Sequence, residues 1–361
     1  MPESDLAVFI LAGGSGERFW PLSRKVRPKQ FFALGGEDSL IRQAYRRALA
    51  LNPKGSPWVL SSESLASALL KELPRLRHER VIQETVAKNT GPAIALGCHL
   101  LAMEHPGACV VILPSDHWIP ELDLFLTTVK TAIRVARSTG GLVTLGIKPH
   151  RAETGYGYIE RGTPKGDIPT AYSANGFYEK PELADAKKYL KSGMYFWNSG
   201  IFIWTVTAFL TELKRVQPDI YDALPAQEEL ETESNRRAAI NKYFVAAPSI
   251  SVDQGIMEKA KSVWVVEAPF AWSDLGTWEA WGETRPADTT QNRTDGDVIV
   301  QDASGNIVYS DEEGRVALLG VDNLVVVRTK DVTLVCPRER VQEIRELVRR
   351  MREENHEDRF L

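Results

Sequence analysis

The 361-residue sequence contains only three cysteines, Cys98, Cys109 and Cys336, and none lies in a CxxC pair or beside histidines at metal-ligand spacing. They are predicted to be reduced core residues of a cytoplasmic protein. The sequence also has no apolar run of membrane-spanning length and no signal-peptide pattern at its start. We therefore expect neither secretion nor a membrane partner.

A surplus of positive charge is missing as well. The 44 lysines and arginines are outnumbered by 48 aspartates and glutamates, which gives a formal net charge of -4. Binding to nucleic acid needs a basic surface. We therefore expect no nucleic-acid partner, and a small mobile substrate is favoured. The sequence has no long internal repeat and no low-complexity tract either.

What the first two-thirds of the sequence does contain is an alternation of short apolar, β-branched runs with longer helix-compatible stretches. This pattern predicts an α/β fold with a mixed, mainly parallel sheet and helices on both faces. The predicted strands are 7–12, 58–61, 110–113 and 142–147, and the predicted helices are 39–51, 90–104 and 124–137. Shorter strands with Gly and Pro turns, at 154–160 and 172–179, predict an antiparallel insertion that lines one side of a cleft.

The residue pattern changes after Trp281, where a polar, turn-rich segment begins. We predict two domains, 1–288 with the α/β sheet and 289–361 as a small β module with a terminal helix. Its predicted strands are 297–301, 306–309, 316–319, 324–328 and 332–336. Residues 338–351 place apolar side chains at intervals of three and four, which predicts an amphipathic helix. The module is also a candidate surface for a homodimer.

The strongest local signal is a glycine-rich segment at the end of the first strand. It consists of Leu11, Ala12, Gly13, Gly14, Ser15 and Gly16. Glycines let backbone N–H groups turn toward an anion, and the nearby cations Arg18 and Lys29 need a counter-charge that phosphate supplies. No Gly-Lys-Ser/Thr follows, so the segment is not a P-loop. Two prolines disfavour helix here, and we expect both cations to lie on an extended loop rather than in a buried scaffold.

The segment LAGGSGERFWPLSRKVRPKQFF, residues 11–32, closely resembles the signature of the sugar-nucleotide pyrophosphorylases, in its mannose-1-phosphate guanylyltransferase branch. Four later segments match the same branch in order: LPSDH at 113–117, FYEKP at 177–181, WNSGIF at 197–202 and WSDLGTW at 272–278. The resemblance implies a Rossmann-like nucleotidyltransferase domain followed by a short left-handed β-helix. It also implies transfer of GMP from GTP to α-D-mannose 1-phosphate, with release of pyrophosphate.

The resemblance also implies roles for individual residues. Arg18 and Lys29 are the expected catalytic cations, and Asp116 and Asp274 the expected ligands of Mg²⁺, which prefers oxygen and keeps waters and phosphate oxygens. The other expected nucleotide contacts, beside residues 11–16, are Gln83, Asn89, Thr90 and Ser115, and the expected sugar-phosphate contacts are Gly157, Glu179, Lys180, Asn198 and Asp253. The chain departs from the family pattern at Thr85, Lys88 and Gly91, where members usually have Pro, Arg and Ala.

The expected reaction needs no protein nucleophile, because a phosphate oxygen of the sugar attacks the α-phosphorus of GTP in line. Positioning and charge neutralisation then carry catalysis. Two alternatives stay open at this stage: the same chemistry with another sugar 1-phosphate or nucleotide, and a non-catalytic nucleotide-sugar sensor that keeps the fold. A glycosyltransferase is disfavoured, since Ser115, Asp116 and His117 do not form a DxD-type metal motif.

Overall fold

The computed structural model describes residues 6–14, 16–25, 27–34, 36–52, 55–311, 314–354 and 360. They belong to two compact units, each with its own apolar core. Unit 1 comprises residues 1–13, 44–115 and 119–272, and unit 2 comprises residues 14–43, 116–118 and 273–361. The domain boundary predicted after residue 288 falls between a helix and a strand, and it stays a prediction.

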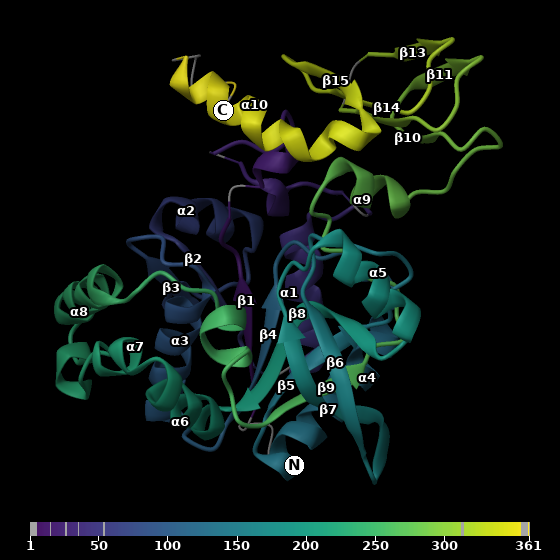
Figure 1. Ribbon diagram of the computed structural model, residues 1–361. Coiled ribbons are helices and arrows are strands. Elements are labelled where there is room, and N and C mark those ends of the chain that lie inside the picture. The colour runs from purple at the N-terminus through teal and green to yellow at the C-terminus, as the bar shows by residue number, and fades with distance from the viewer. Residues whose placement is uncertain are drawn as a thin grey trace. The chain divides into compact units, whose positions relative to one another are not determined.

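Unit 1 is built on a nine-stranded mixed sheet (Figure 1) with the order β3-β2-β1-β4-β8-β5-β9-β7-β6. The first four strands in that order are parallel, and β8 runs antiparallel between β4 and β5. This arrangement confirms the predicted α/β fold with a mixed sheet. The strands are β1 Leu6–Leu11, β2 Trp58–Ser62, β3 Val81–Glu84, β4 Cys109–Pro114, β5 Leu142–Ile147, β6 Tyr158–Lys165, β7 Ile168–Tyr178, β8 Tyr195–Thr205 and β9 Val263–Glu267.

Helices cover both faces of this sheet, as its parallel part requires. Phe9 and Ile112 lie in the cluster that includes the apolar side chains of α3 and α6, whereas the alternating residues Ile10 and Val111 are equally buried on the other face. The predicted helices are confirmed with ends shifted by up to two residues. The helices are α1 Leu40–Leu51, α2 Glu63–Glu72, α3 Thr90–Glu104, α4 Leu122–Thr139, α5 Leu183–Ser192, α6 Val206–Val216, α7 Pro218–Asp222 and α8 Glu233–Ala246.

The predicted antiparallel insertion is the β6–β7 hairpin, whose strands pair along most of their length. Strand β6 also pairs with the start of β8, where Ile159 lies opposite Phe196. Because of these pairings, the residues just before β6, at the end of β7 and in the first half of β8 are gathered at one place in unit 1.

The carboxyl-terminal part of unit 2 is a small β-helix-like module. Its strands are β10 Arg293–Asp295, β11 Val298–Gln301, β12 Ile307–Ser310, β13 Val316–Leu319, β14 Leu324–Arg328 and β15 Thr333–Pro337. The pairs β10–β12, β12–β14 and β11–β13 are parallel, and only β15 pairs antiparallel to β14. Successive coils are tied by buried asparagines: the Asn306 side chain donates to Asn292 at 2.9 Å and accepts from the Leu324 N–H at 2.9 Å.

The core of unit 2 joins the module to residues near the amino terminus of the chain. Trp278 and Trp281, on α9 Trp278–Glu283, are fully buried and pack around Tyr309. Phe19 packs on Trp278 with ring centroids 4.7 Å apart, and Trp278 Nε1 donates to the Trp20 carbonyl at 3.2 Å. Phe19 and Trp20 of the signature segment, residues 11–32, are therefore held by the same core that supports the β module.

The predicted carboxyl-terminal helix over 338–351 is wrong in its first part. Residues Arg338–Glu343 form a 3₁₀ helix, and only Ile344–Glu353 form the α-helix α10. The tighter first turns allow Arg338 to reach Glu279 with its guanidinium and the Gly305 carbonyl with Nη1 at 2.8 Å. Among the described residues, no helix combines the length and the apolarity needed to cross a membrane.

Candidate functional site

The glycine-rich segment adopts the conformation for which glycine is needed. Gly14 and Gly16 have φ of 96° and 60°, which a residue with a side chain adopts only with strain. A Cβ at Gly16 would lie 2.8 Å from both Cβ of Lys29 and Oγ of Ser23. Gly16 is therefore required twice, for its backbone angles and for the close approach of Lys29.

The beginning of this segment is anchored to the sheet of unit 1. The Ala12 N–H donates to the Leu60 carbonyl at 2.8 Å, and the Ala12 carbonyl accepts from Ser61 Oγ at 2.8 Å. The Leu11 carbonyl accepts from the Ser115 N–H at 2.9 Å. Gly13 is exposed and its Cα has open space around it. Ala12 thus has no backbone N–H left for an anion, and Ser15 lies outside the described residues.

Lys29 does not lie on an extended loop, contrary to the prediction. It begins the 3₁₀ turn Lys29–Phe31 and is only 5% exposed. Its ammonium lies 2.7 Å from the Asp116 carboxylate and donates to the carbonyls of Asp274 and Leu275 at 2.8 and 2.9 Å. A buried ammonium needs such partners, since burial without them is costly. Arg18 is exposed as expected, but it lies in the 3₁₀ turn Glu17–Phe19 and not on an extended loop.

The structure brings Asp116 and Asp274 together because their segments pair. The N–H of Trp118 donates to the Ser273 carbonyl at 2.9 Å, and the Ser273 N–H donates back at 3.1 Å. Asp116 lies two residues after the end of β4, and Asp274 follows the bridge. The Asp274 carboxylate also accepts from the Gly276 N–H at 2.9 Å, which fixes the turn that presents it.

These residues line a cavity of about 320 Å³ in unit 2. Its lining is polar and holds three lysine or arginine side chains, one histidine and three acidic side chains. The lining residues are Gly16, Glu17, Arg18, Phe19, Lys29, Asp116, His117, Asp274, Gly276 and Arg345. Within the described ranges, no cluster of three or more His, Cys, Asp or Glu side chains forms a protein-only metal site. Two carboxylates facing one cavity fit Mg²⁺, which completes its octahedron with waters and phosphate oxygens.

The electrostatics of Asp116 favour its ionised form. Burial raises the pKa of Asp116, but the Lys29 ammonium, His117 and hydrogen bonds to the carboxylate outweigh it, so the pKa lies below its ordinary value. The carboxylate is one-third exposed, so it keeps a side open toward the cavity.

The expected nucleotide contacts of unit 1 have mixed environments. Gln83 lies on β3 and is half-buried. Asn89 caps α3 by accepting the Thr90 N–H at 2.9 Å, and Thr90 Oγ1 accepts from the Val252 N–H at 2.9 Å. Both side-chain oxygens therefore already serve the fold. Ser115 Oγ is buried without a hydrogen-bond partner among the described residues.

One of the three departures from the family pattern has a structural reason. A Cβ at Gly91 would lie 2.7 Å from the Ile250 carbonyl, to which the Gly91 N–H donates at 3.0 Å. Lys88 uses its carbonyl to accept from the Ile250 N–H at 3.2 Å. Backbone hydrogen bonds thus hold the segments around residues 90 and 250 at a distance that only glycine permits at position 91.

Sequence reasoning did not select Glu84, which ends β3. This carboxylate is half-buried and makes no hydrogen bond or ion pair within the described part of the chain. Burial raises the pKa of Glu84 to about 7. A carboxylate beside Gln83 at the carboxyl end of a parallel strand is well placed to bind a ligand. The available signal was that Glu84 begins the family segment in which the chain departs at Thr85, Lys88 and Gly91.

All five expected sugar-phosphate residues gather in unit 1. Asn198 links them: its N–H donates to the Gly157 carbonyl at 2.8 Å, and Nδ2 donates to Asp253 at 2.8 Å. A Cβ at Gly157 would lie 2.6 Å from the Glu179 carboxylate, so a side chain there would displace that carboxylate. Lys180, 62% exposed, places its ammonium 3.1 Å from Glu179. The cluster joins a cation, two carboxylates and an amide, which suits a phosphorylated sugar.

A buried threonine in this cluster was missed. Thr144 Oγ1 on β5 donates to Asn198 Oδ1 at 3.0 Å, which fixes the orientation of the amide. A threonine in an apolar strand carries no signal in the sequence, because nothing there distinguishes it from a core residue.

Asp253 in the same cluster has a shifted pKa. Burial and the neighbouring Glu179 charge raise the pKa of Asp253 to about 6, although Asn198 and Lys180 act in the opposite direction.

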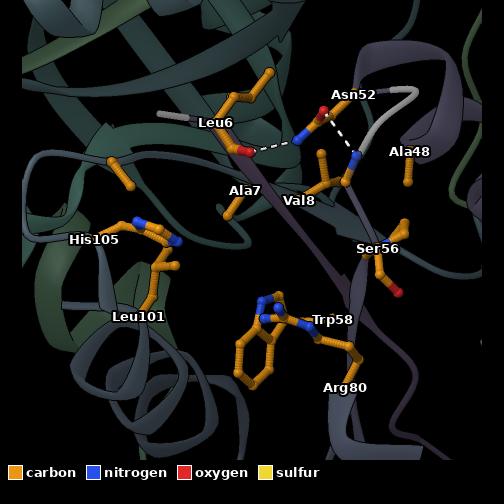
Figure 2. A pocket seen from close by; sticks show the side chains of 13 residues that line it. Leu6, Ala7, Val8, Ala48, Asn52, Ser56, Trp58, Arg80, Leu101 and His105 are labelled. Carbon is orange, nitrogen blue, oxygen red and sulfur yellow. Dashed lines mark hydrogen bonds between the residues drawn. The ribbon is translucent and has the colours of Figure 1, made fainter. Parts of the chain in front are cut away.

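Unit 1 has a further cavity, of about 310 Å³, at the amino ends of β1 and β2 (Figure 2). Trp58, Arg80 and His105 lie on one side of it, and Asn52 donates to the Leu6 carbonyl at 2.6 Å on the other. None of the expected site residues lines it. Ligands of open α/β sheets bind at the carboxyl ends of the strands, which are the opposite ends.

Comparisons with known proteins identify the family of the chain. The Nucleotidyl transferase family matches residues 7–291, and the MannoseP isomerase/GMP-like beta-helix domain matches residues 296–351. The chain therefore belongs to the nucleotidyl transferase family, which confirms the fold class predicted from the sequence.

Comparison with individual relatives shows which branch of this family the chain is similar to in sequence. The chain is 37% identical over 357 residues to the mannose-1-phosphate guanylyltransferase of Salmonella montevideo, covering 97% of this chain and 74% of that protein. It is 38% identical to the enzyme of the same name from Klebsiella pneumoniae, covering 94% and 72%. A structure from Thermus thermophilus, described as a mannose-1-phosphate geranyltransferase, matches with a TM-score of 0.85 and 32% identity, covering 96% and 99%. The guanylyltransferase names confirm the branch that the signature resembles.

Proposed function

We propose that this chain transfers GMP from GTP to α-D-mannose 1-phosphate, giving GDP-mannose and pyrophosphate. The observation that carries the proposal is the unit 2 cavity, where Arg18, Lys29, Asp116 and Asp274 meet. Relatives named for this activity extend over nearly the whole chain. The sensor alternative is disfavoured, since all four of these charged side chains are present.

The reaction forms one bond and breaks one. An oxygen of the sugar phosphate attacks the α-phosphorus of GTP, and the bond to the bridging oxygen breaks, so the electron pair leaves with pyrophosphate. The attacking oxygen is already ionised, and no protein base is needed. Arg18, exposed and without an ion-pair partner among the described residues, is assigned to the leaving pyrophosphate. Lys29 is also assigned to neutralise the negative charge of the leaving pyrophosphate, and it holds Asp116 in place.

We assign Asp116 and Asp274 as the side chains that would hold a divalent cation, in particular Mg²⁺. When bound, such a cation supplies charge neutralisation on phosphate oxygens. The low pKa of Asp116 supports the assignment, because a ligand carboxylate must be ionised. The backbone bridge between Trp118 and Ser273 keeps the two aspartates in register without the cation.

Guanine selection is assigned to the end of β3. Guanine presents two neighbouring donors, N1–H and N2–H, and a carboxylate accepts both, whereas adenine offers no such pair. Glu84 is the half-buried carboxylate at this strand end, next to Gln83. Asn89 and Thr90 are assigned to the same nucleotide region by the family resemblance, although Asn89 also caps α3 and Thr90 Oγ1 also accepts from the Val252 N–H.

The Asn198 cluster is assigned to mannose 1-phosphate. Glu179 and Asn198 are assigned to sugar hydroxyls, and Lys180, whose ammonium is exposed, to the phosphate. Asp253 orients Asn198 and is the second carboxylate available to a hydroxyl. Gly157 supports the assignment because its missing side chain leaves room for Glu179.

The experiment that tests the proposed reaction measures pyrophosphate release in the presence of Mg²⁺. GTP, ATP, UTP and dTTP are each crossed with mannose 1-phosphate and glucose 1-phosphate. The proposal expects strong release only with GTP and mannose 1-phosphate. Release with another pair would replace the substrates but keep the chemistry, and no release with any pair would favour a sensor.

We also propose that the protein acts in the cytoplasm, which its three free cysteines support. A homodimer through the β module is proposed as well. Its support is a set of apolar side chains on the module that stay exposed: Ile299 at 48%, Leu319 at 68% and Val335 at 57%. A monomer mass in light scattering at assay concentration would contradict the dimer.

A further inference from the structure

The unit 2 cavity contains a cation to which the sequence analysis gave no role. Arg345 lies in the first turn of α10 and lines the cavity together with Arg18 and Lys29. Helix α10 contacts the 3₁₀ turn Glu17–Phe19 that carries Arg18 (Figure 1). The three cations therefore reach one cavity from three separate segments, and the last of these is the terminal helix of the β module.

Glu17 holds Arg345 beside the cavity. Its carboxylate lies 3.4 Å from Arg345 Nε and 2.7 Å from Arg352 Nη1. One carboxylate cannot neutralise two guanidinium groups, so this trio keeps a positive charge. Within the described ranges, Arg345 makes no other ion pair or hydrogen bond, and its side chain is 69% exposed. The terminal nitrogens of Arg345 are therefore free to bind an anion.

The other cations of the cavity are engaged to different degrees. Lys29 is occupied by Asp116 and two carbonyls, whereas Arg18 has no ion-pair partner among the described residues. Arg18 and Arg345 are thus the two guanidinium groups that an incoming anion meets. A planar guanidinium offers parallel donors that match phosphate oxygens.

We propose that Arg345 is a phosphate-binding residue that contacts the pyrophosphate end of the nucleotide, and that Glu17 orients it. The inference rests on the proposed function, because the anion is taken to be the β- and γ-phosphates of GTP or the pyrophosphate product. It also gives the carboxyl-terminal module a part in substrate binding. A chain without a folded α10 would keep Arg18 and Lys29 but lose this cation.

The matched pair of variants for the test is Arg345→Gln and Arg352→Gln. Each removes one ion pair with Glu17, but only Arg345 lines the cavity. Binding of inorganic pyrophosphate is measured by calorimetry, together with KM for GTP in the forward reaction and for pyrophosphate in the reverse one. We expect Arg345→Gln to weaken pyrophosphate binding about tenfold or more, and Arg352→Gln to change it less than about twofold. Arg345→Lys should recover part of the loss, since it keeps the charge.

The outcomes separate the inference from the proposed function. Equal losses in the two glutamine variants, or no loss in either, would overturn the role of Arg345. If the wild-type chain releases no pyrophosphate with any substrate pair, the proposed function fails, yet pyrophosphate binding still decides on Arg345. Thermal unfolding of both variants checks that a loss of binding does not reflect a loss of folding.

Discussion

The ammonium of Lys29 lies 2.7 Å from the carboxylate of Asp116, with the lysine side chain 6% and the aspartate side chain 33% exposed. The pair is therefore asymmetric: the cation is enclosed by protein, and the anion keeps an open side. Lys29 serves the fold of unit 2 by bonding two carbonyls, as well as the charge of the cavity. Asp116 is held ionised and positioned for a ligand.

Lys29→Met should therefore lower both activity and stability. Turnover is expected to fall by about two orders of magnitude, as for other preorganised charge stabilisers. The free energy of unfolding should fall by about 2 kcal/mol, because two carbonyls and a carboxylate lose their partner. The measurements are kcat and chemical denaturation. Lys25→Met, at an exposed lysine of the same segment, is the control, and unchanged turnover in Lys29→Met would remove the assigned role.

Gly16→Ala should destabilise the protein by about 1–3 kcal/mol, the usual cost of a strained backbone. Its φ of 60° and the 2.8 Å approach of Lys29 Cβ both oppose a side chain. Gly13→Ala is the control, since no atom lies within 4 Å of a Cβ there. Denaturation of the two variants side by side makes the comparison, and equal stability would contradict the close packing of the loop.

Asp253→Asn should change how stability depends on pH. Burial raises the pKa of Asp253 to about 6 in the folded chain, above the value of about 4 expected when unfolded. The native state then binds more protons than the unfolded state in this window, so stability falls as pH rises from about 4 to 6. The wild type should lose up to about 3 kcal/mol through this group, and the variant should not.

Urea denaturation of both proteins at several pH values between about 4 and 7.5 measures this difference. Asn keeps an oxygen that can accept from Asn198 Nδ2, so the variant tests the charge rather than the hydrogen bond. Parallel pH profiles of the two proteins would show that Asp253 does not titrate in this range.

Glu84→Gln should relax the choice of base. If the carboxylate accepts the two donors of guanine, replacing one oxygen by an amide NH₂ sets donor against donor. The ratio of kcat/KM for GTP to that for ATP should fall by at least about tenfold. Glu79→Gln, at an exposed glutamate before the same strand, is the control. An unchanged ratio would place guanine selection elsewhere.

The local elements could be predicted from the sequence because their signals are short-ranged. The alternation of apolar runs with helix-compatible stretches marked helix α3 and strand β5 at the bounds that the structure shows. The C-terminal α-helix was predicted to begin six residues too early, because apolar periodicity does not separate a 3₁₀ helix from an α-helix. The contact of Arg338 with Glu279 accompanies the 3₁₀ conformation and joins residues far apart in the sequence. The signature segment and the later family segments identified the family and selected Lys29, Asp116 and Asp274, which do meet in one cavity.

The sequence by itself determined the fold class, the family and the residue types of the phosphate cavity, since these depend on patterns within single segments. Only the tertiary structure decided that Lys29 is buried, that Thr144 orients Asn198 and that Arg345 lines the same cavity as Arg18. Each of these relations joins residues tens to hundreds of positions apart. Burial and partners arise from packing between such segments, and no local pattern encodes them.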